Sequence, residues 1–289
     1  MHPARQLLIA ALRWASGVLV AGLLAALLLY AAPGATVDER EIDPALGERT
    51  RARLRAEAGA RPDFVSYYAG FLQSALRGDL GTSRAYHLPV TQLIGERWSL
   101  TAAAVAEGLA AAWALGLAGA LLSAGSRWAS PPFTAFSVLL LCLPSGLLAI
   151  AFFLARLPVA GILAAAVFPK IYQYLRNLLD QAARAPHCLA ARARGIGPLR
   201  LLLLHRAWPL WPEAVTLAGV TVSTAIGAAI PTEALCDVPG LGQLAWKSAL
   251  ARDLPLLVAL TIAVAAVTLG VNSVASVAAA AGGGRRWRS

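Results

Sequence analysis

Long runs of hydrophobic residues, separated by short charged stretches, dominate the chain. Six of these runs are long enough to cross about 30 Å of hydrocarbon as helices. The fourth run is the weakest, because Pro169 and Lys170 interrupt it. The expected spans are roughly residues 14–32, 100–122, 132–154, 159–175, 214–230 and 256–278. We therefore expect an all-α, polytopic membrane protein with six transmembrane helices.

The composition supports this class. Of the 289 residues, 58% are hydrophobic and 14% are charged, so the chain has more apolar surface than one soluble core can bury. The formal net charge is +10, but the basic residues lie mainly at the edges of the apolar runs and not on a polar face with interleaved aromatic residues. We expect contact with membrane lipid and no nucleic-acid partner.

The arginines predict an orientation. With six spans, the basic residues before the first run, between the second and third runs, between the fourth and fifth runs, and after the sixth run all fall on one side. We assign that side to the cytosol, which places both termini there. Residues 37–97 hold nine arginines and nine acids and form a long connection that escapes the rule. We expect this connection to be a small extracytoplasmic helical subdomain.

The first run has two interpretations. Arg5 and Arg13 precede it and small residues follow it, as in a secretory signal. Its apolar core exceeds the roughly 7–15 residues of a signal, which favours a retained helix. The expected parts are a transmembrane helix (1–36), the subdomain (37–97), a five-helix core (98–282) with a cytosolic loop at about 185–207 and an outer loop at 231–255, and a basic cytosolic tail (283–289).

The cytosolic segment 190–206 predicts two helices joined by a sharp turn. Gly195 suits the left-handed residue after a helix end, and Pro198 suits the first turn of the next helix. Small alanines leave room for a partner surface, while Arg192, Arg194 and Arg200 can reach acidic groups or lipid phosphates. Composition leaves two interpretations open, a docking surface for a protein and a basic helix that rests on anionic headgroups.

Two outer segments contain glycine turns. The first is a predicted helix, Phe64–Leu76, followed by a tight turn in which Gly78 and Gly81 permit positive φ. The second follows Glu233, where Pro239, Gly240 and Gly242 predict a rigid turn, and residues 243–250 can form a short re-entrant helix. That helix could line an outer mouth, or the segment could be an ordinary surface loop.

Candidate chemistry in the spans is sparse. Glu107 lies about 10 Å inside the second span, where it could meet a cationic substrate group, pair with a partner subunit or hydrogen-bond within the bundle.

The three cysteines, Cys142, Cys188 and Cys236, lie far apart, and the histidines form no metal-binding pattern, so we expect no metal site. Neither lysine follows a phosphate-binding glycine pattern. If ATP drives this protein, another subunit must hydrolyse it.

Several short motifs together resemble one family, the membrane permeases of ATP-binding-cassette importers for dipeptides, oligopeptides or nickel. The resemblance covers nearly the whole chain. The motifs are Ala32-Pro33-Gly34, Arg77-Gly78-Asp79-Leu80-Gly81, Leu143-Pro144-Ser145, Ala191-Arg192-Ala193-Arg194-Gly195 with His205, Glu233 with Pro239-Gly240-Leu241-Gly242, and Arg252-Asp253.

The resemblance implies a non-catalytic subunit of a bacterial inner membrane that forms half of a pore. In the family, the cytosolic segment is the EAA loop, which docks on an ATPase subunit. The residues that this implies for coupling are Ala190, Ala191, Arg192, Ala193, Arg194, Gly195, Ile196 and His205. The outer loop, with Glu233, Pro239, Gly240, Gly242 and Asp253, would lie beneath a substrate-binding protein.

The implied partners are a second, related permease, two ATPase subunits that bind ATP and Mg, and the binding protein. The chain departs from the family in its short external segment at about 156–161, in His187-Cys188, and in Gly197, where a serine cap is common. The alternative function is an ion-coupled secondary transporter with Glu107 as the coupling acid, but we find no convincing repeats or paired broken helices. A membrane enzyme lacks support, because no nucleophile, base and orienting group cluster in the sequence.

Overall fold

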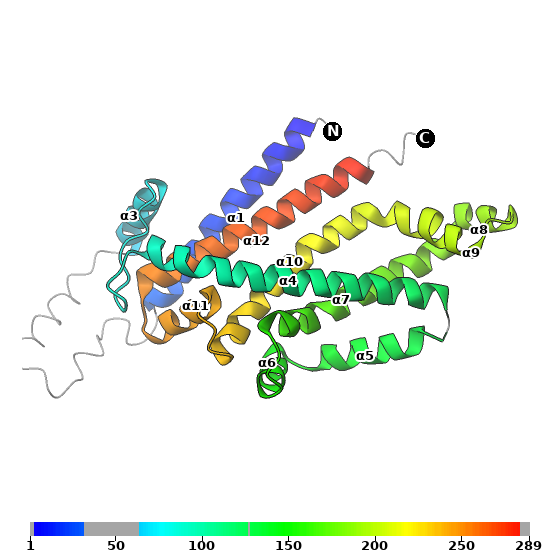
Figure 1. The fold of residues 1–289 in the computed structure, drawn as a ribbon. Helices are drawn as coiled ribbons and strands as arrows, with labels where there is room; N and C mark the ends of the chain where they lie inside the picture. The colour runs from blue at the N-terminus through cyan, green and yellow to red at the C-terminus, as the bar shows by residue number, and fades with distance from the viewer. Residues whose placement is uncertain (1–2, 32–63, 127, 284–289) are drawn as a thin grey trace, which may run out of the picture. The chain divides into compact units, whose positions relative to one another are not determined.

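The computed structural model describes residues 3–31, 64–126 and 128–283. Over these residues the chain is helical, and its only β contact is an isolated bridge between Thr82 and Pro89 (Figure 1). This confirms the all-α prediction. The elements are α1 (Pro3–Ala31), α3 (Phe64–Leu76), α4 (Val90–Gly125), α5 (Ser130–Cys142), α6 (Ser145–Leu154), α7 (Val159–Ala183), α8 (Pro186–Ala193), α9 (Pro198–Arg200), η2 (Leu201–Ala207), η3 (Trp208–Leu210), α10 (Trp211–Leu235), α11 (Leu241–Leu250) and α12 (Leu254–Gly283).

Four helical stretches in the described residues are long and apolar enough to cross a membrane. They are Leu7–Leu28, Val90–Gly125, Pro198–Leu235 and Leu254–Ala281. The pair α5 and α6 makes a fifth if the two helices count as one broken span. The helix α7, which corresponds to the fourth expected span, is 25 residues long but carries too many polar residues to join them. The six-span prediction is therefore confirmed only in part.

The third expected span is broken near its middle. The axes of α5 and α6 differ by 103°. Leu143 is extended, with φ −92° and ψ 119°, because the ring of the following Pro144 disfavours the helical conformation at the residue before it. The apolar run is thus two helices and not one continuous helix.

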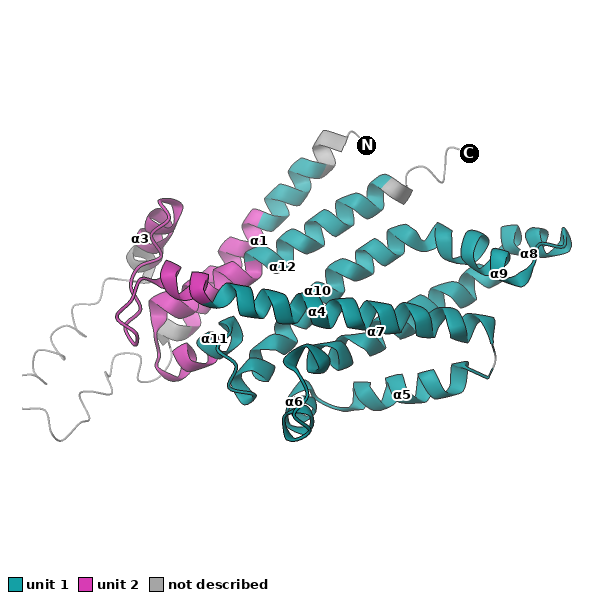
Figure 2. Cartoon of the chain, viewed as in Figure 1, with its two compact units in different colours: residues 1–14, 97–244, 266–289 teal, residues 15–96, 245–265 magenta. Residues whose placement is uncertain are grey.

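The chain divides into two compact units, which Figure 2 colours separately. Unit 1 contains residues 1–14, 97–244 and 266–289, and unit 2 contains residues 15–96 and 245–265. The expected extracytoplasmic subdomain, 37–97, lies mostly in unit 2, but its residues 37–63 are outside the described part of the chain.

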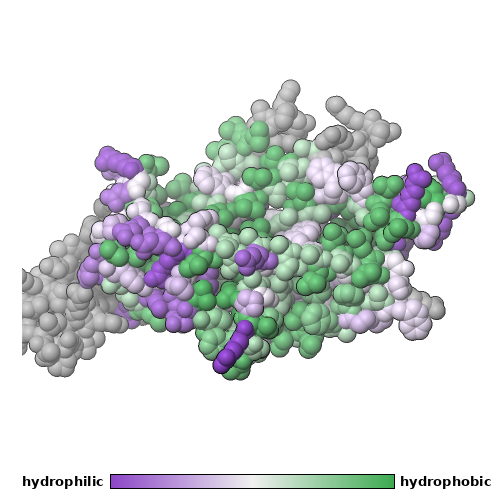
Figure 3. Space-filling model, in the orientation of Figure 1, coloured by the Kyte–Doolittle hydropathy of each residue, from purple (hydrophilic) through white to green (hydrophobic). Residues whose placement is uncertain are grey.

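The core of unit 1 is built around α7. Ile162, Val167, Ile171 and Tyr172 are fully buried, and α7 packs against α4, α5, α6 and α10. Large apolar side chains remain exposed on the surrounding helices, including Leu139 on α5. Figure 3 shows this hydrophobic surface in green and a hydrophilic patch where α8 and α9 lie. Such a surface suits lipid contact.

Small residues allow α4 to approach α7 closely. Gly108, Ala112, Gly116 and Ala120 recur every four residues and therefore share one face of α4. A Cβ added at Gly116 would lie 2.6 Å from the Cγ2 atom of Ile171, so no larger residue fits there without a shift. This small-residue face is typical of membrane helix packing.

Unit 2 joins α1, α3 and α12. The Tyr68 hydroxyl donates to the Leu19 carbonyl oxygen at 2.8 Å. Burial raises the pKa of the Tyr68 phenol, so this group stays a neutral donor at physiological pH. Gly22 leaves room for Ile262, because an added Cβ would lie 2.7 Å from its Cγ1 atom.

Candidate functional site

The predicted segment 190–206 contains helical elements joined by a sharp turn. The first helix, α8, begins at Pro186 and ends at Ala193, and Gly195 follows with φ 76°. That left-handed conformation favours glycine, and it lets the Ile196 N–H donate to the Ala191 carbonyl oxygen at 3.3 Å. The turn is therefore specified by Gly195, as the sequence predicted.

The second helix of the pair is not a regular α-helix. Only α9 is α-helical, and residues Leu201–Ala207 form the π-helix η2. Pro209 lies four residues after His205 and has no N–H to donate to the His205 carbonyl, which loses its α-helical partner. His187 Nε2 lies 3.1 Å from that oxygen, and Cys188 Sγ donates to it at 3.3 Å. The two residues that depart from the family pattern thus tie α8 to η2.

Arg206 anchors η2 to the ends of two long helices. The residue is 8% exposed, and its Nε and Nη2 atoms donate to the Leu179 carbonyl oxygen of α7 at 3.2 and 3.0 Å. Its Nη1 atom donates to the Ala124 carbonyl oxygen of α4 at 3.4 Å, and Nη2 lies 3.9 Å from the Asp180 carboxylate. The guanidinium charge therefore complements the negative C-terminal ends of α4 and α7.

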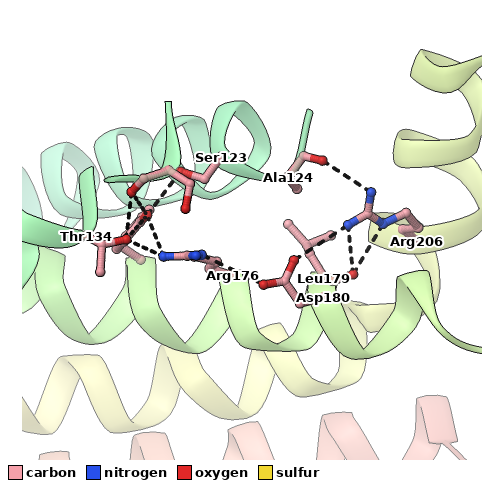
Figure 4. A network of polar contacts seen from close by, with 9 residues as sticks. Ser123, Ala124, Thr134, Arg176, Leu179, Asp180 and Arg206 are labelled. Carbon is pink, nitrogen blue, oxygen red and sulfur yellow. Dashed lines mark hydrogen bonds and ion pairs between the residues drawn. The ribbon is translucent and has the colours of Figure 1, made fainter. Parts of the chain in front are cut away.

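A second arginine extends this network to α5 (Figure 4). Arg176 lies 3.8 Å from Asp180 and donates to the Thr134 hydroxyl. The Tyr172 hydroxyl lies 3.0 Å from both the Ser123 and the Thr134 hydroxyls. Polar contacts thus connect η2 with the neighbouring ends of α4, α5 and α7, and a displacement of η2 would act on all three helices.

The outward face of the segment combines apolar and basic groups. The buried residues of α8 are Ala191 and Cys188, whose Sγ atom donates to the His205 carbonyl oxygen. Leu189, Ala190 and Ala193 are exposed on α8, and Leu199 on α9 is 68% exposed. The exposed basic residues are Arg192, Arg194 and Arg200. This face can contact an apolar pocket with an acidic rim.

The predicted outer loop folds over a buried carboxylate. Glu233 is fully buried in α10, and its Oε2 atom accepts the Gly242 N–H at 2.7 Å. Gly240 and Gly242 are needed here, because an added Cβ at either position would collide with the Glu233 carboxylate or the α10 backbone. Thr101 of α4 accepts the Leu241 N–H at 2.8 Å and holds the start of α11. Pro239 precedes this turn, and the expected short helix after it is α11.

The last outer-loop residue, Asp253, serves a different contact within unit 2. It is fully buried and accepts hydrogen bonds from the Ser83 hydroxyl and, at 3.1 Å, from the Ala85 N–H. Gly78 and Gly81 have φ 83° and 81°, as the predicted glycine turn requires. Asp253 therefore fixes the turn that follows α3.

Glu107, the acid predicted inside the second span, is exposed on α4. Its side chain has no hydrogen-bond or ion-pair partner among residues 3–31, 64–126 and 128–283. The structure does not bring it together with the coupling or outer-loop residues. The same described residues contain no group of three or more potential metal ligands.

Sequence reasoning missed Arg206 and the network around Arg176. Both arginines were counted only as topogenic charges, although Arg206 follows the motif residue His205 directly. A helical projection would have placed Arg176 and Asp180 on one face, four residues apart. Nothing in the sequence pairs Arg206 with Leu179 and Ala124, because these contacts depend on the tertiary packing of three elements.

Comparisons with known proteins agree with the motifs. Over 279 residues, the chain is 28% identical to a putative peptide permease protein of Brucella ovis, with 85% of this chain and 87% of the relative covered. It is 25% identical over 275 residues to the oligopeptide transport system permease protein OppB of Haemophilus influenzae, with 86% and 88% covered. It is 28% identical over 252 residues to the glutathione transport system permease protein GsiC of Pectobacterium atrosepticum, with 80% of each chain covered.

A family match covers the region that contains both candidate segments. Residues 113–284 match the family of binding-protein-dependent transport system inner membrane components, and this range includes α7, α8, η2 and the predicted outer loop. Such a component is a multi-pass protein of the inner membrane, and ATP hydrolysis belongs to separate subunits. The chain belongs to the family of binding-protein-dependent transport system inner membrane components and is a permease subunit of an ATP-binding-cassette importer.

Proposed function

We propose that this chain forms half of the translocation pore of an importer for short peptides. The second half would come from a related permease. Two ATPase subunits would bind ATP and Mg, and a substrate-binding protein would deliver the solute, so that this chain itself needs no cofactor. The peptide assignment rests on relatives that are named as peptide, oligopeptide and glutathione permeases, and nickel is the other solute class that the motifs allow.

The proposed topology has six spans, with α7 as the sixth membrane helix besides the four apolar stretches and the α5–α6 pair. Its length supports this role, because 25 residues extend about 37 Å as a helix. Some of its polar residues meet polar partners on neighbouring helices, as Gln173 does at 2.8 Å from Ser137. Both termini and residues 184–210 would then lie in the cytosol, in agreement with the arginine distribution.

The observation that carries the proposed mechanism is the α8–η2 segment and its attachment to the spans. Its exposed apolar and basic face would dock in a cleft of the ATPase. ATP binding would close the ATPase dimer and move the segment, and Arg206 would pass this movement to α4 and α7. The pore would thereby switch from inward-facing to outward-facing, which is transport by alternating access.

Purification of the native complex, with identification of its subunits by mass spectrometry, tests the composition. We expect a second permease and ATPase subunits, with the binding protein present when solute is added. Purification of this chain without any ATPase would contradict the proposal. Uptake into vesicles at constant ATP should also survive collapse of the proton gradient, whereas an ion-coupled transporter would stop.

A further inference from the structure

One face of α7 carries a row of exposed polar residues. Lys170, Tyr174, Asn177 and Gln181 are all exposed, and their spacing of three to four residues places them on one side of the helix. The row extends about 17 Å along the helix axis. The exposed face of the neighbouring α5 is different, because it presents Leu139 and other apolar side chains.

Lys170 lies near the middle of the membrane-length helices. It occupies the centre of the 25-residue helix α7, and its Nζ atom donates to the Thr224 hydroxyl at 3.2 Å. Thr224 is itself near the centre of α10, inside the apolar stretch Pro198–Leu235. The distances along the axis to the two ends of α7 are about 17 Å and about 20 Å, and both exceed the length of a lysine side chain.

An ammonium group at this depth needs water or an anion. Charged side chains within membrane spans face a bundle interior or an aqueous path, because their transfer into hydrocarbon is unfavourable. Thr224 accepts from only one of the three N–H donors of Lys170. No acid in residues 3–31, 64–126 or 128–283 lies within ion-pair distance of the Lys170 ammonium.

We propose that this row lines the translocation path and that Lys170 binds a carboxylate of the transported solute, such as the C-terminal carboxylate of a peptide. The proposal deepens the proposed function and rests on it. An acid on the partner permease would also pair with Lys170. Such an acid would not account for Tyr174, Asn177 and Gln181, which continue the row as uncharged polar groups toward the C-terminal end of α7. The exposed Asp180 beside them already pairs with Arg176 and Arg206. A path for a hydrophilic solute requires polar groups along its length.

Cysteine labelling in the purified, assembled complex in proteoliposomes tests the path. In a background with Cys142, Cys188 and Cys236 replaced by alanine, Asn177→Cys and Gln181→Cys should react with small hydrophilic methanethiosulfonate reagents. Leu139→Cys is the matched control, because this 59% exposed residue lies on an apolar face and should stay unlabelled. Unlabelled Asn177→Cys and Gln181→Cys would overturn the proposal, since the row would then be covered by the partner permease or by lipid.

The charge of the reagent tests the anion site. Arg176 and Asp180, which pair with each other, flank position 177 on α7, so the readout is a comparison between backgrounds. The ratio of labelling of Asn177→Cys by the anionic sulfonatoethyl reagent to labelling by the cationic trimethylammonium reagent of similar size should be higher with Lys170 than with Lys170→Gln. One positive charge about 10 Å away changes the rate with each reagent by about 2- to 15-fold in opposite directions, so the ratio should be about 4- to 200-fold higher with Lys170 than without it. Addition of Lys170→Gln should remove this increase in the ratio, and Lys170→Arg should retain it. An unchanged ratio in Lys170→Gln would overturn the anion site.

Failure of the proposed function would have a different signature. The complex would then lack ATPase subunits or show no hydrolysis stimulated by the binding protein, whatever the residue at position 170. Transport of an alanine dipeptide by an active complex tests the same anion site by function. Lys170→Gln should lower its uptake by about tenfold or more, because one charged hydrogen bond to the carboxylate is lost.

Discussion

Replacement of Gly195 by valine should uncouple the transporter without preventing its insertion. Gly195 has φ 76°, and an added Cβ would have no neighbour within 4 Å, so the substitution acts on backbone conformation and not on packing. A residue with a Cβ in the left-handed conformation costs about 1–2 kcal/mol, and a β-branched residue costs more. That energy lowers the population of the native turn by about 5- to 30-fold relative to competing turns.

The assay is ATP hydrolysis by the assembled complex, with and without the binding protein. The expected order of stimulation is glycine, asparagine, alanine and valine, with none left in Gly195→Val, because asparagine tolerates the left-handed conformation better than other residues with a Cβ. Co-purification of the ATPase subunits with Gly195→Asn serves as the control for assembly. Normal stimulation in Gly195→Val would refute the assignment of this turn to coupling.

Two further substitutions test the packing of the candidate segments. Arg206→Met removes charged hydrogen bonds, each of which contributes about 1.5–3 kcal/mol. The unfolding temperature of the protein and the ATP hydrolysis stimulated by the binding protein should therefore both fall. The control, Arg192→Met on the exposed face, should leave the unfolding temperature unchanged. Equal unfolding temperatures for the two variants would contradict the anchoring role. Gly242→Ala places a Cβ 2.6 Å from the Ile230 Cα atom and should destabilise the protein by about 1–3 kcal/mol in thermal unfolding. The control is Gly227→Ala, whose added Cβ meets no atom within 4 Å and should leave the stability unchanged. A wild-type melting curve for Gly242→Ala would argue against the close packing of the outer turn.

Local signals in the sequence predicted several elements well. The helix Phe64–Leu76 was expected from its apolar spacing, and the turns at Gly78, Gly81 and Gly195 from the preference of glycine for positive φ. The short helix of the outer loop was also expected, and α11 starts two residues earlier than the prediction. These features depend on a few neighbouring residues, so the sequence carries enough information to specify them.

The features that were missed depend on tertiary contacts or on competing local preferences. The bend at Leu143 is hidden in an apolar run, although Pro144 disfavours helix at the preceding residue. The π-helix η2 contains four leucines, which alone suggest an ordinary helix, and its form depends on Pro209 and on the contacts of His187 and Cys188 with the His205 carbonyl oxygen. The sequence of α7 looked like a weak span, because average hydropathy does not record that its polar residues share one face of the helix.

Photo-crosslinking from α8 tests the central claim most directly. A benzoylphenylalanine at position 193, which is exposed on α8, should crosslink to an ATPase subunit of the assembled complex in native membranes. The same group at position 139, on the apolar face of α5, should not. A crosslink from position 193 to the ATPase is the result that the account predicts. Crosslinks from position 193 to lipid alone, in a complex that contains the ATPase, would contradict it.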